Sequence, residues 1–306
     1  MSNATSVAEG AAPIQAAKTS AGVKISAWVE TTKPRIATLL LLMAVASYFL
    51  ALRQGGAFSW YGLMSVVVVV VVLSMGIFPL NHWMERDRDQ LMLRTRSRPL
   101  PAKILRPKAV LAFGLVCSFA SFALAWLLAG WLTAAIAVFV AVSYLLLYTP
   151  LKYRTAYHTS VGALSGATPP LIGWSIAIGS LSPDAWVLTA LMFFWQFPHF
   201  LSIDLIYRDD YAKAGIKVLP VVDQSGRATA IQVIGATVLL TGVSIVPVFT
   251  GLAHPAYGII AGLLGLVFLY FGVRAVTSRQ KMAAKHLLRA SVLYLPLVFI
   301  TLLINF

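Results

Sequence analysis

The chain has 306 residues, of which 59% are hydrophobic and only 11% are charged. A soluble domain carries about twice that fraction of charge, so this composition excludes a water-soluble globule. The net charge of +14 would suggest nucleic-acid binding in a soluble protein, but in a membrane protein it indicates loops that stay in the cytoplasm. The single cysteine, Cys117, excludes an internal disulfide and a thiolate metal site.

Residues 1–30 are rich in Ala, Ser, Thr and Gly and contain no apolar core. This composition predicts a disordered cytoplasmic tail, followed by a single domain over residues 31–306. A mitochondrial transit peptide is the competing interpretation of the tail. The lack of arginine before Arg35 and the presence of Glu9 count against it.

Nine apolar stretches are long enough to cross a bilayer as helices. They lie at about 36–52, 61–82, 109–129, 131–149, 159–179, 185–205, 229–250, 255–275 and 287–305. Only Ala129-Gly130-Trp131 separates the third stretch from the fourth, so these two form a helical hairpin. The sequence therefore predicts an all-α membrane protein with nine transmembrane helices embedded in lipid, which also excludes a nucleic-acid partner.

Lys and Arg residues collect on one side of the predicted bundle, and only Arg53 falls in a connection on the other side. This bias places the amino terminus in the cytoplasm and the carboxyl terminus outside, and we expect a bacterial inner membrane. Acidic residues gather on the same side, which the positive-inside rule does not require. They are Glu85, Asp87, Asp89, Asp204, Asp209, Asp210 and Asp223. Both signs of charge at one membrane face indicate a functional site.

The first acidic cluster follows the second apolar stretch. Asn81, Glu85 and Asp89 are spaced four residues apart, so they share one face if the helix continues past residue 82. One amide oxygen and two carboxylates suit Mg²⁺, which takes hard oxygen ligands and keeps places for water and phosphate. A solvated helix end is the alternative, since carboxylates cost less at a membrane boundary than at mid-depth.

A dense basic segment with Arg94, Arg96 and Arg98 comes next. Part of it is ordinary positive-inside charge. Arginine forks also clamp phosphate oxygens through two hydrogen bonds. Carboxylates that hold a metal beside arginines that hold phosphate describe a site for a magnesium–diphosphate group.

The pattern Asn-x₃-Glu-x₃-Asp after the second of nine helices resembles the first motif of the UbiA-type intramembrane prenyltransferases. Six segments, in chain order, are similar to the protohaem IX farnesyltransferase branch of that family. They are Thr32–Ile36, Asn81–Pro101, Tyr148–Thr155, Gly166–Trp174, Trp195–Phe200 (Trp-Gln-Phe-Pro-His-Phe) and Asp210–Pro220 (Asp-Tyr-x-x-Ala-Gly-Ile-Lys-Val-Leu-Pro, from Asp210). The last two point to the haem branch, whereas the first motif points only to the family.

The resemblance implies a UbiA-like bundle with a cytoplasm-facing active-site chamber. It implies transfer of the farnesyl group of farnesyl diphosphate to a vinyl group of protohaem, with addition of water, giving haem O and diphosphate. Mg²⁺ is the implied cofactor, and a haem A synthase or a terminal oxidase is an implied assembly partner.

The resemblance also assigns residues. It gives Asn81, Glu85 and Asp89 to the metal and diphosphate, and a diphosphate clamp to Arg94, Arg98, Lys152 and Arg154, with Lys33, Arg35 and Lys217 as further candidates. Asp210 fits the haem-branch pattern, but Asp204 stands where a small or apolar residue is expected, which puts a complete second metal site in doubt. His199 is a candidate axial ligand of the haem, and His158 is a candidate for polar lining. A packing role and a proton-transfer role stay open for His199.

Aromatic residues are expected around the chamber, where ring faces could shield a cation. They are Trp174, Phe193, Phe194, Trp195, Phe197 and Phe200. Two other functions remain open. One is a UbiA-type enzyme that prenylates a quinone precursor or a chlorin, and the other is a secondary transporter, although transporters place charges near mid-bilayer.

Overall fold

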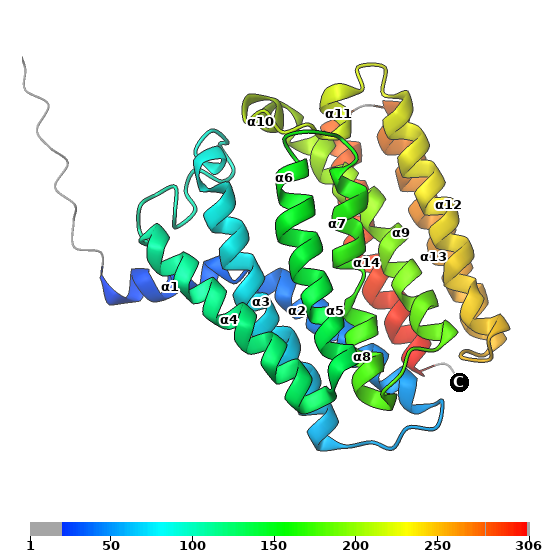
Figure 1. Cartoon of the computed structure of the whole chain (residues 1–306). Coiled ribbons are helices and arrows are strands. Elements are labelled where there is room, and N and C mark those ends of the chain that lie inside the picture. Colours follow the sequence, from blue (N-terminus) through cyan, green and yellow to red (C-terminus); the bar gives the residue numbers. More distant parts are fainter. Residues whose placement is uncertain (1–19, 279, 305–306) are drawn as a thin grey trace, which may run out of the picture.

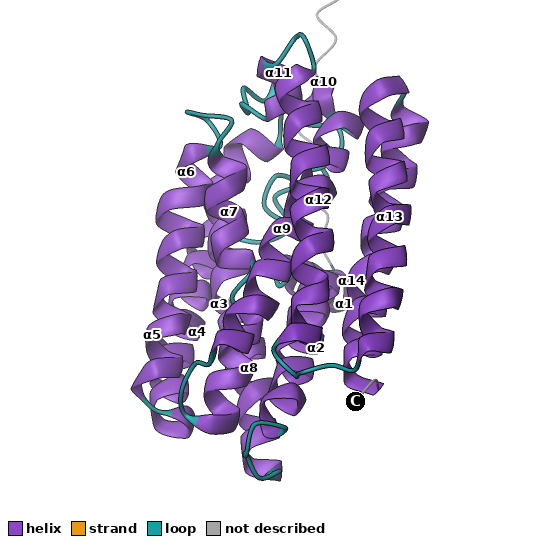
Figure 2. Cartoon of the chain, turned by 90° about the vertical axis from the view of Figure 1, so that its right-hand side faces the viewer, coloured by secondary structure: helices purple, strands orange, loops and turns teal. Residues whose placement is uncertain are grey.

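The computed structural model describes residues 20–278 and 280–304, and these residues form helices and no strands. Figures 1 and 2 show the helices gathered into one bundle. They are α1 (Ala21–Thr31), α2 (Pro34–Leu52), α3 (Trp60–Asp89), α4 (Pro107–Ala129), α5 (Trp131–Ala141), η1 (Val142–Tyr148), α6 (Thr149–Leu151), α7 (His158–Gly166), α8 (Pro169–Ile178), α9 (Pro183–Ile206), α10 (Arg208–Lys213), α11 (Leu219–Val222), α12 (Arg227–Phe249), α13 (Pro255–Ser278) and α14 (Lys281–Ile304).

Nine segments of the described chain are long and apolar enough to cross a membrane. They are α2, α3, α4, α5–η1–α6, α7–α8, α9, α12, α13 and α14. The predicted all-helical class and the nine spans are therefore confirmed. The second span is about two turns longer than the apolar run that predicted it, and the ninth begins about one and a half turns earlier than expected.

Helix α3 is the longest element, with 30 residues. At 1.5 Å per residue it measures about 45 Å, whereas the hydrocarbon core of a bilayer is about 30 Å thick. The helix continues through Pro79 and carries the polar residues from Asn81 to Asp89 on its last turns. The polar motif is therefore helical, as the spacing of its residues requires.

Helix α1 covers residues 21–31, of which residues 21–30 were expected to belong to a disordered tail. The Ser20 hydroxyl caps its first turn by accepting a hydrogen bond from the Val23 N–H. Trp28 packs edge-to-face on Phe113 of α4 with ring centres 5.1 Å apart, and Ala27 is buried among apolar residues of the α3–α4 connection. This packing stabilises a helix that its composition alone does not predict. Residues 1–19 of the predicted tail lie outside the described residues.

Two spans are irregular. The fourth passes through the π-helix η1, in which hydrogen bonds run five residues back and the turn is wider than in an α-helix. The fifth breaks between α7 and α8, where Pro169 and Pro170 supply no N–H donors. Irregular backbone at membrane depth is tolerated where it lies in the protein interior or lines a cavity.

Close backbone packing joins α2 to α8. A Cβ atom at Gly173 would overlap the carbonyl oxygen of Ala44, so only glycine fits there. Nearby, the Ser47 hydroxyl donates a 2.7 Å hydrogen bond to the Pro170 carbonyl oxygen. These contacts fix the broken fifth span against the first.

The connections 90–106, 152–157 and 207–226 lie at one end of the bundle, the upper end in Figure 1. This end is termed the charged end, because it holds the acidic and basic clusters identified in the sequence.

Candidate active site

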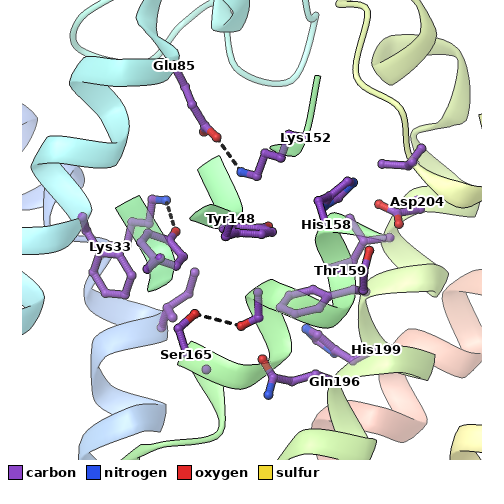
Figure 3. Close-up of a pocket in the computed structure, with 18 of the residues that line it drawn as sticks. Lys33, Glu85, Tyr148, Lys152, His158, Thr159, Ser165, Gln196, His199 and Asp204 are labelled. Carbon is purple, nitrogen blue, oxygen red and sulfur yellow. Dashed lines mark hydrogen bonds and ion pairs between the residues drawn. The ribbon is translucent and has the colours of Figure 1, made fainter. Parts of the chain in front are cut away.

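A cavity of about 300 Å³ lies inside the bundle next to the charged end, and its size falls within the range of ligand pockets. Helices α2, α3, α7 and α9 and the π-helix η1 supply most of its wall, and residues from 92–98 and 211–218 line it near the charged end. Figure 3 shows the polar side chains that face it. It is termed the central cavity below.

Two buried ion pairs lie on the wall of the central cavity. Lys152 Nζ is 2.5 Å from Glu85 Oε1, and Arg98 NH1 is 2.8 Å from Asp89 Oδ2. Glu85 and Asp89 stand one turn apart on α3, whereas Lys152 follows α6 and Arg98 follows α3 by nine residues. The structure therefore brings together four of the predicted site residues around one space.

Lys152 stays charged in this position. Burial lowers the pKa of the Lys152 ammonium, but the carboxylate of Glu85 outweighs burial and raises the pKa well above its usual value. The ammonium also lies 4.4 Å from the centre of the Tyr148 ring. A permanent positive charge on the cavity wall suits an anionic ligand.

Asn81 is fully buried and does not line the cavity. Its side-chain oxygen accepts a 2.8 Å hydrogen bond from Lys33 Nζ, and its side-chain nitrogen donates to Thr149 Oγ1 at 3.1 Å. Lys33 itself lines the cavity and also reaches the hydroxyl of Tyr144 at 3.5 Å. Asn81 thus fixes the ammonium group of a cavity lysine, Lys33. Its assignment as a metal ligand stays a prediction.

Lys33 is the most readily deprotonated lysine of the site. Burial, followed by the positive charge of Arg98, lowers the pKa of Lys33 to about 7. The residue has a left-handed backbone conformation with φ of 49° immediately before Pro34, the first residue of α2. Its side chain belongs to the cavity although it is distant from the acidic motif in sequence.

Arg94 lies where the cavity meets the charged end. Its guanidinium donates a 3.3 Å hydrogen bond to the Tyr211 hydroxyl and stacks 5.2 Å from the centre of the Tyr207 ring. Arg94 is otherwise exposed, so it is held in place by two aromatic residues near α10 while keeping donors for a ligand. This is the position that a phosphate clamp requires.

The structure does not bring every candidate to the cavity. Arg154 is exposed in the turn after α6 and does not line the cavity. Asp210 lies on the short helix α10, outside the cavity. The exposed residues Arg35, on α2, and Lys217, after α10, lie outside the cavity as well. None of these four residues lines the cavity, although the Lys217 backbone N–H donates a 2.9 Å hydrogen bond to the Lys152 carbonyl oxygen.

Asp204, which departs from the haem-branch pattern, lines the cavity instead of Asp210. It is 5% exposed, and its Oδ2 atom has no hydrogen-bond partner among the described residues. His158, also 5% exposed, lines the same wall with both ring nitrogens unpartnered. Figure 3 shows both residues across the cavity from Lys33. They are polar groups that a ligand or water can satisfy.

His199 lines the deeper part of the cavity with Trp195 and Gln196 from the same helix, α9. Its Nδ1 atom is 2.8 Å from the Ser291 hydroxyl of α14. Gln196 is held by the carbonyl oxygen of Ala163 at 3.0 Å. The segment that pointed to the haem branch therefore faces the cavity.

Of the aromatic residues expected around the chamber, only Trp195 and Phe200 line it. Phe78, Tyr144 and Tyr148 line it as well, outside the predicted aromatic set. A signal was present: Tyr144, Tyr148 and Lys152 are spaced four residues apart, as the acidic stripe of α3 is.

Residues 40–300 match the UbiA prenyltransferase family. The chain therefore belongs to the UbiA prenyltransferase family, as its motifs predicted. Two relatives are each named protoheme IX farnesyltransferase. The protein from Solibacter usitatus is 43% identical over 91% of this chain and 98% of its own length. The protein from Koribacter versatilis is 36% identical over 90% of this chain and 92% of its own length.

Solved structures show the same fold at low sequence identity. A structure of digeranylgeranylglyceryl phosphate synthase has a TM-score of 0.74 at 15% identity and covers 92% of this chain and 98% of that one. A UbiA homologue from Archaeoglobus fulgidus, bound to GPP and Mg²⁺, has a TM-score of 0.64 at 14% identity, with 90% and 99% covered.

Proposed function

We propose that the chain transfers the farnesyl group of farnesyl diphosphate to a vinyl group of protohaem IX, with addition of water, to give haem O and diphosphate. The observation that carries this proposal is a single cavity that joins two buried ion pairs at the charged end to a deeper wall formed by Trp195, Gln196 and His199. The names of relatives at 36–43% identity over nearly the whole chain support the choice of substrates.

The residues present fit a bound Mg²⁺ ion. Each ion pair uses one oxygen of Glu85 or Asp89, which leaves a second oxygen on each carboxylate at the cavity wall. No three His, Cys, Asp or Glu side chains of the described chain converge on one point, so water and diphosphate oxygens would complete the shell. The magnesium-bound relative from Archaeoglobus fulgidus supports this assignment. When bound, the ion would neutralise negative charge on the departing diphosphate.

The basic residues at the charged end bind and orient the diphosphate. Lys152 and Arg98 are held by carboxylates in the ligand-free chain, and each can turn its remaining donors to phosphate oxygens. Lys33 and Arg94 approach the same space from α2 and from the α3–α4 connection. Positive charge aimed at the leaving group stabilises the charge that develops as the allylic carbon–oxygen bond breaks.

Apolar and aromatic side chains enclose the allylic cation that remains. Ile77, Phe78, Leu40 and Tyr144 line the cavity on the side of α2, α3 and η1. Such walls exclude bulk water, and ring faces attract a cation. The haem vinyl group attacks this cation through a new carbon–carbon bond, and one water molecule then adds to the new cation and releases a proton, which leaves a hydroxyl group.

We place the charged end on the cytoplasmic side of a bacterial inner membrane, with the amino terminus inside and the carboxyl terminus outside. The excess of Lys and Arg in the connections at this end supports that orientation. The same charge distribution argues against a secondary transporter, whose charged groups lie near mid-bilayer between repeats. A haem A synthase or a terminal oxidase is the proposed consumer of the product.

Membranes that contain the chain, incubated with protohaem and labelled farnesyl diphosphate, should form labelled haem O. Removal of divalent ions by EDTA should stop the reaction, and added Mg²⁺ should restore it. Asp89→Asn should lower the rate by about 100-fold or more, because charge stabilisation at the leaving group is lost. Asp87→Asn is the matched control, since the Asp87 side chain is 74% exposed and pairs only with Arg86 at the surface.

Label on 4-hydroxybenzoate or a chlorin, and none on protohaem, would contradict the proposed substrate. An Asp89→Asn rate equal to that of Asp87→Asn would contradict the metal and diphosphate assignment.

A further inference from the structure

Ser291 of helix α14 contacts the imidazole ring of His199. Nδ1 of His199 lies 2.8 Å from the hydroxyl oxygen of Ser291, which is fully buried. Trp195 donates its indole N–H to the carbonyl oxygen of Ser291 at 2.8 Å, and its ring stacks on the imidazole with centres 4.6 Å apart and planes 19° apart. One serine thus contacts two cavity residues of α9 that stand one turn apart, Trp195 and His199.

The hydrogen bonds of Ser291 determine where the imidazole proton lies. The Ser291 hydroxyl donates its only proton to the Leu288 carbonyl oxygen at 2.7 Å. The Leu288 carbonyl oxygen can only accept, so with the hydroxyl proton directed there the Ser291 oxygen accepts from Nδ1 of His199; this arrangement satisfies all three groups and favours the proton on Nδ1. Within the described chain no carboxylate lies within ion-pair distance of this ring. Nε2 of the neutral ring keeps its lone pair.

That lone pair belongs to the cavity side of the ring. His199 lines the central cavity, and Nε2 makes no hydrogen bond with any described residue. A histidine that ligates a metal usually donates its other ring N–H to a neighbouring group, which fixes the tautomer and the ring orientation. The pair formed by His199 and Ser291 has this arrangement.

We propose that Ser291 is a positioning residue that fixes His199 in the Nδ1–H tautomer, so that Nε2 presents a lone pair to the iron of a haem in the central cavity. The identity of the iron ligand rests on the function proposed above, whereas the tautomer rests on the hydrogen bonds alone. The two parts are tested separately.

The tautomer is tested in the ligand-free, full-length chain by nitrogen-15 NMR of labelled histidine in lipid, with the His199 signal identified by its loss in His199→Gln. The expected spectrum shows a protonated Nδ1 and an unprotonated Nε2 at neutral pH. A proton on Nε2 overturns the proposal, whatever the substrate.

The effect on haem is tested with Ser291→Ala and titration with protohaem, followed by the absorption spectrum. The expected result is a shifted haem spectrum and a dissociation constant raised about ten-fold or more, the usual cost of losing such a supporting hydrogen bond. Ser291→Thr, which keeps the hydroxyl, should recover both.

Ser244→Ala is the matched control. Ser244 of α12 is as buried as Ser291, and its replacement removes a 2.8 Å hydrogen bond to Tyr294, which lies on α14 as Ser291 does. It should leave the haem spectrum unchanged. A spectrum and affinity in Ser291→Ala equal to those of Ser244→Ala overturn the positioning role. If the unaltered chain makes no haem O but shows the Nδ1–H tautomer, the proposed function is wrong and the assignment of the proton to Nδ1 is correct.

Discussion

Replacing Lys152 by methionine would leave the carboxylate of Glu85 on the cavity wall without its counter-charge. The two side chains are only 15% and 10% exposed, so solvent compensates the lost charge poorly. Removing one partner of a buried ion pair lowers the free energy of unfolding by about 3–5 kcal/mol. Because this pair lines a cavity and keeps some exposure, we expect a loss near the lower limit, about 3 kcal/mol. At roughly 2–4 °C per kcal/mol, the melting temperature should fall by roughly 6–12 °C.

The double variant Glu85→Gln/Lys152→Met removes both charges together. Replacing a whole buried pair by neutral groups of similar size is often close to neutral, so its melting temperature should lie well above that of Lys152→Met. Neither variant should turn over substrate. The comparison separates the loss of a counter-charge from the loss of packing, which both variants share.

The assay is thermal unfolding of the detergent-purified chain. Arg86→Met is the control, because Arg86 pairs with Asp87 at 3.5 Å and the Asp87 side chain is 74% exposed. Exposed pairs contribute about 0–1 kcal/mol, so this variant should melt near the unaltered chain. A Lys152→Met variant no less stable than Arg86→Met would refute the view that the cavity wall shields its ion pairs from water.

Two further predictions concern packing. Asp204→Ala should raise stability by about 1–2 kcal/mol in the ligand-free chain, since it removes a buried carboxyl group with an unpartnered oxygen; an unchanged or lower melting temperature would show that Asp204 is satisfied by water or by a bound ion. Gly173→Ala should lower stability by about 2–3 kcal/mol, because its Cβ overlaps the Ala44 carbonyl oxygen. Gly235→Ala, with nothing within 4 Å of the added Cβ, should instead be neutral or stabilising by up to about 1 kcal/mol, and equal melting temperatures for the two variants would contradict the close packing.

Hydropathy predicts the nine spans because a chain in lipid must satisfy its own backbone, and helices are the means by which single apolar stretches do so. Hydropathy does not predict helix α1, because this helix depends on the contact between Trp28 and Phe113, which are more than eighty residues apart. Hydropathy does not predict the π-helix η1 either, because the same apolar composition is compatible with α-helical and with π-helical hydrogen bonding.

The site was predictable where one helix carries it. The spacing of Glu85 and Asp89 on α3 predicts a shared face, and both do line the cavity. Lys152 and Arg154 could not be separated from sequence, because they follow a helix whose phase changes at η1. Nor could Asp204 be preferred to Asp210, since the choice depends on where α9 ends and α10 turns away.

The wide turn at Val142–Tyr148 also sets the rotational phase of everything after it in the fourth span. A π-helical turn behaves as an α-helix that has taken in one extra residue, and each residue of an α-helix advances the direction of a side chain by about 100°. If the same residues wound as a regular α-helix, every side chain after this segment would be rotated by about 100°, and the Lys152 ammonium would point away from Glu85. The winding of this segment, as much as the identity of the two side chains, therefore determines whether Lys152 and Glu85 meet.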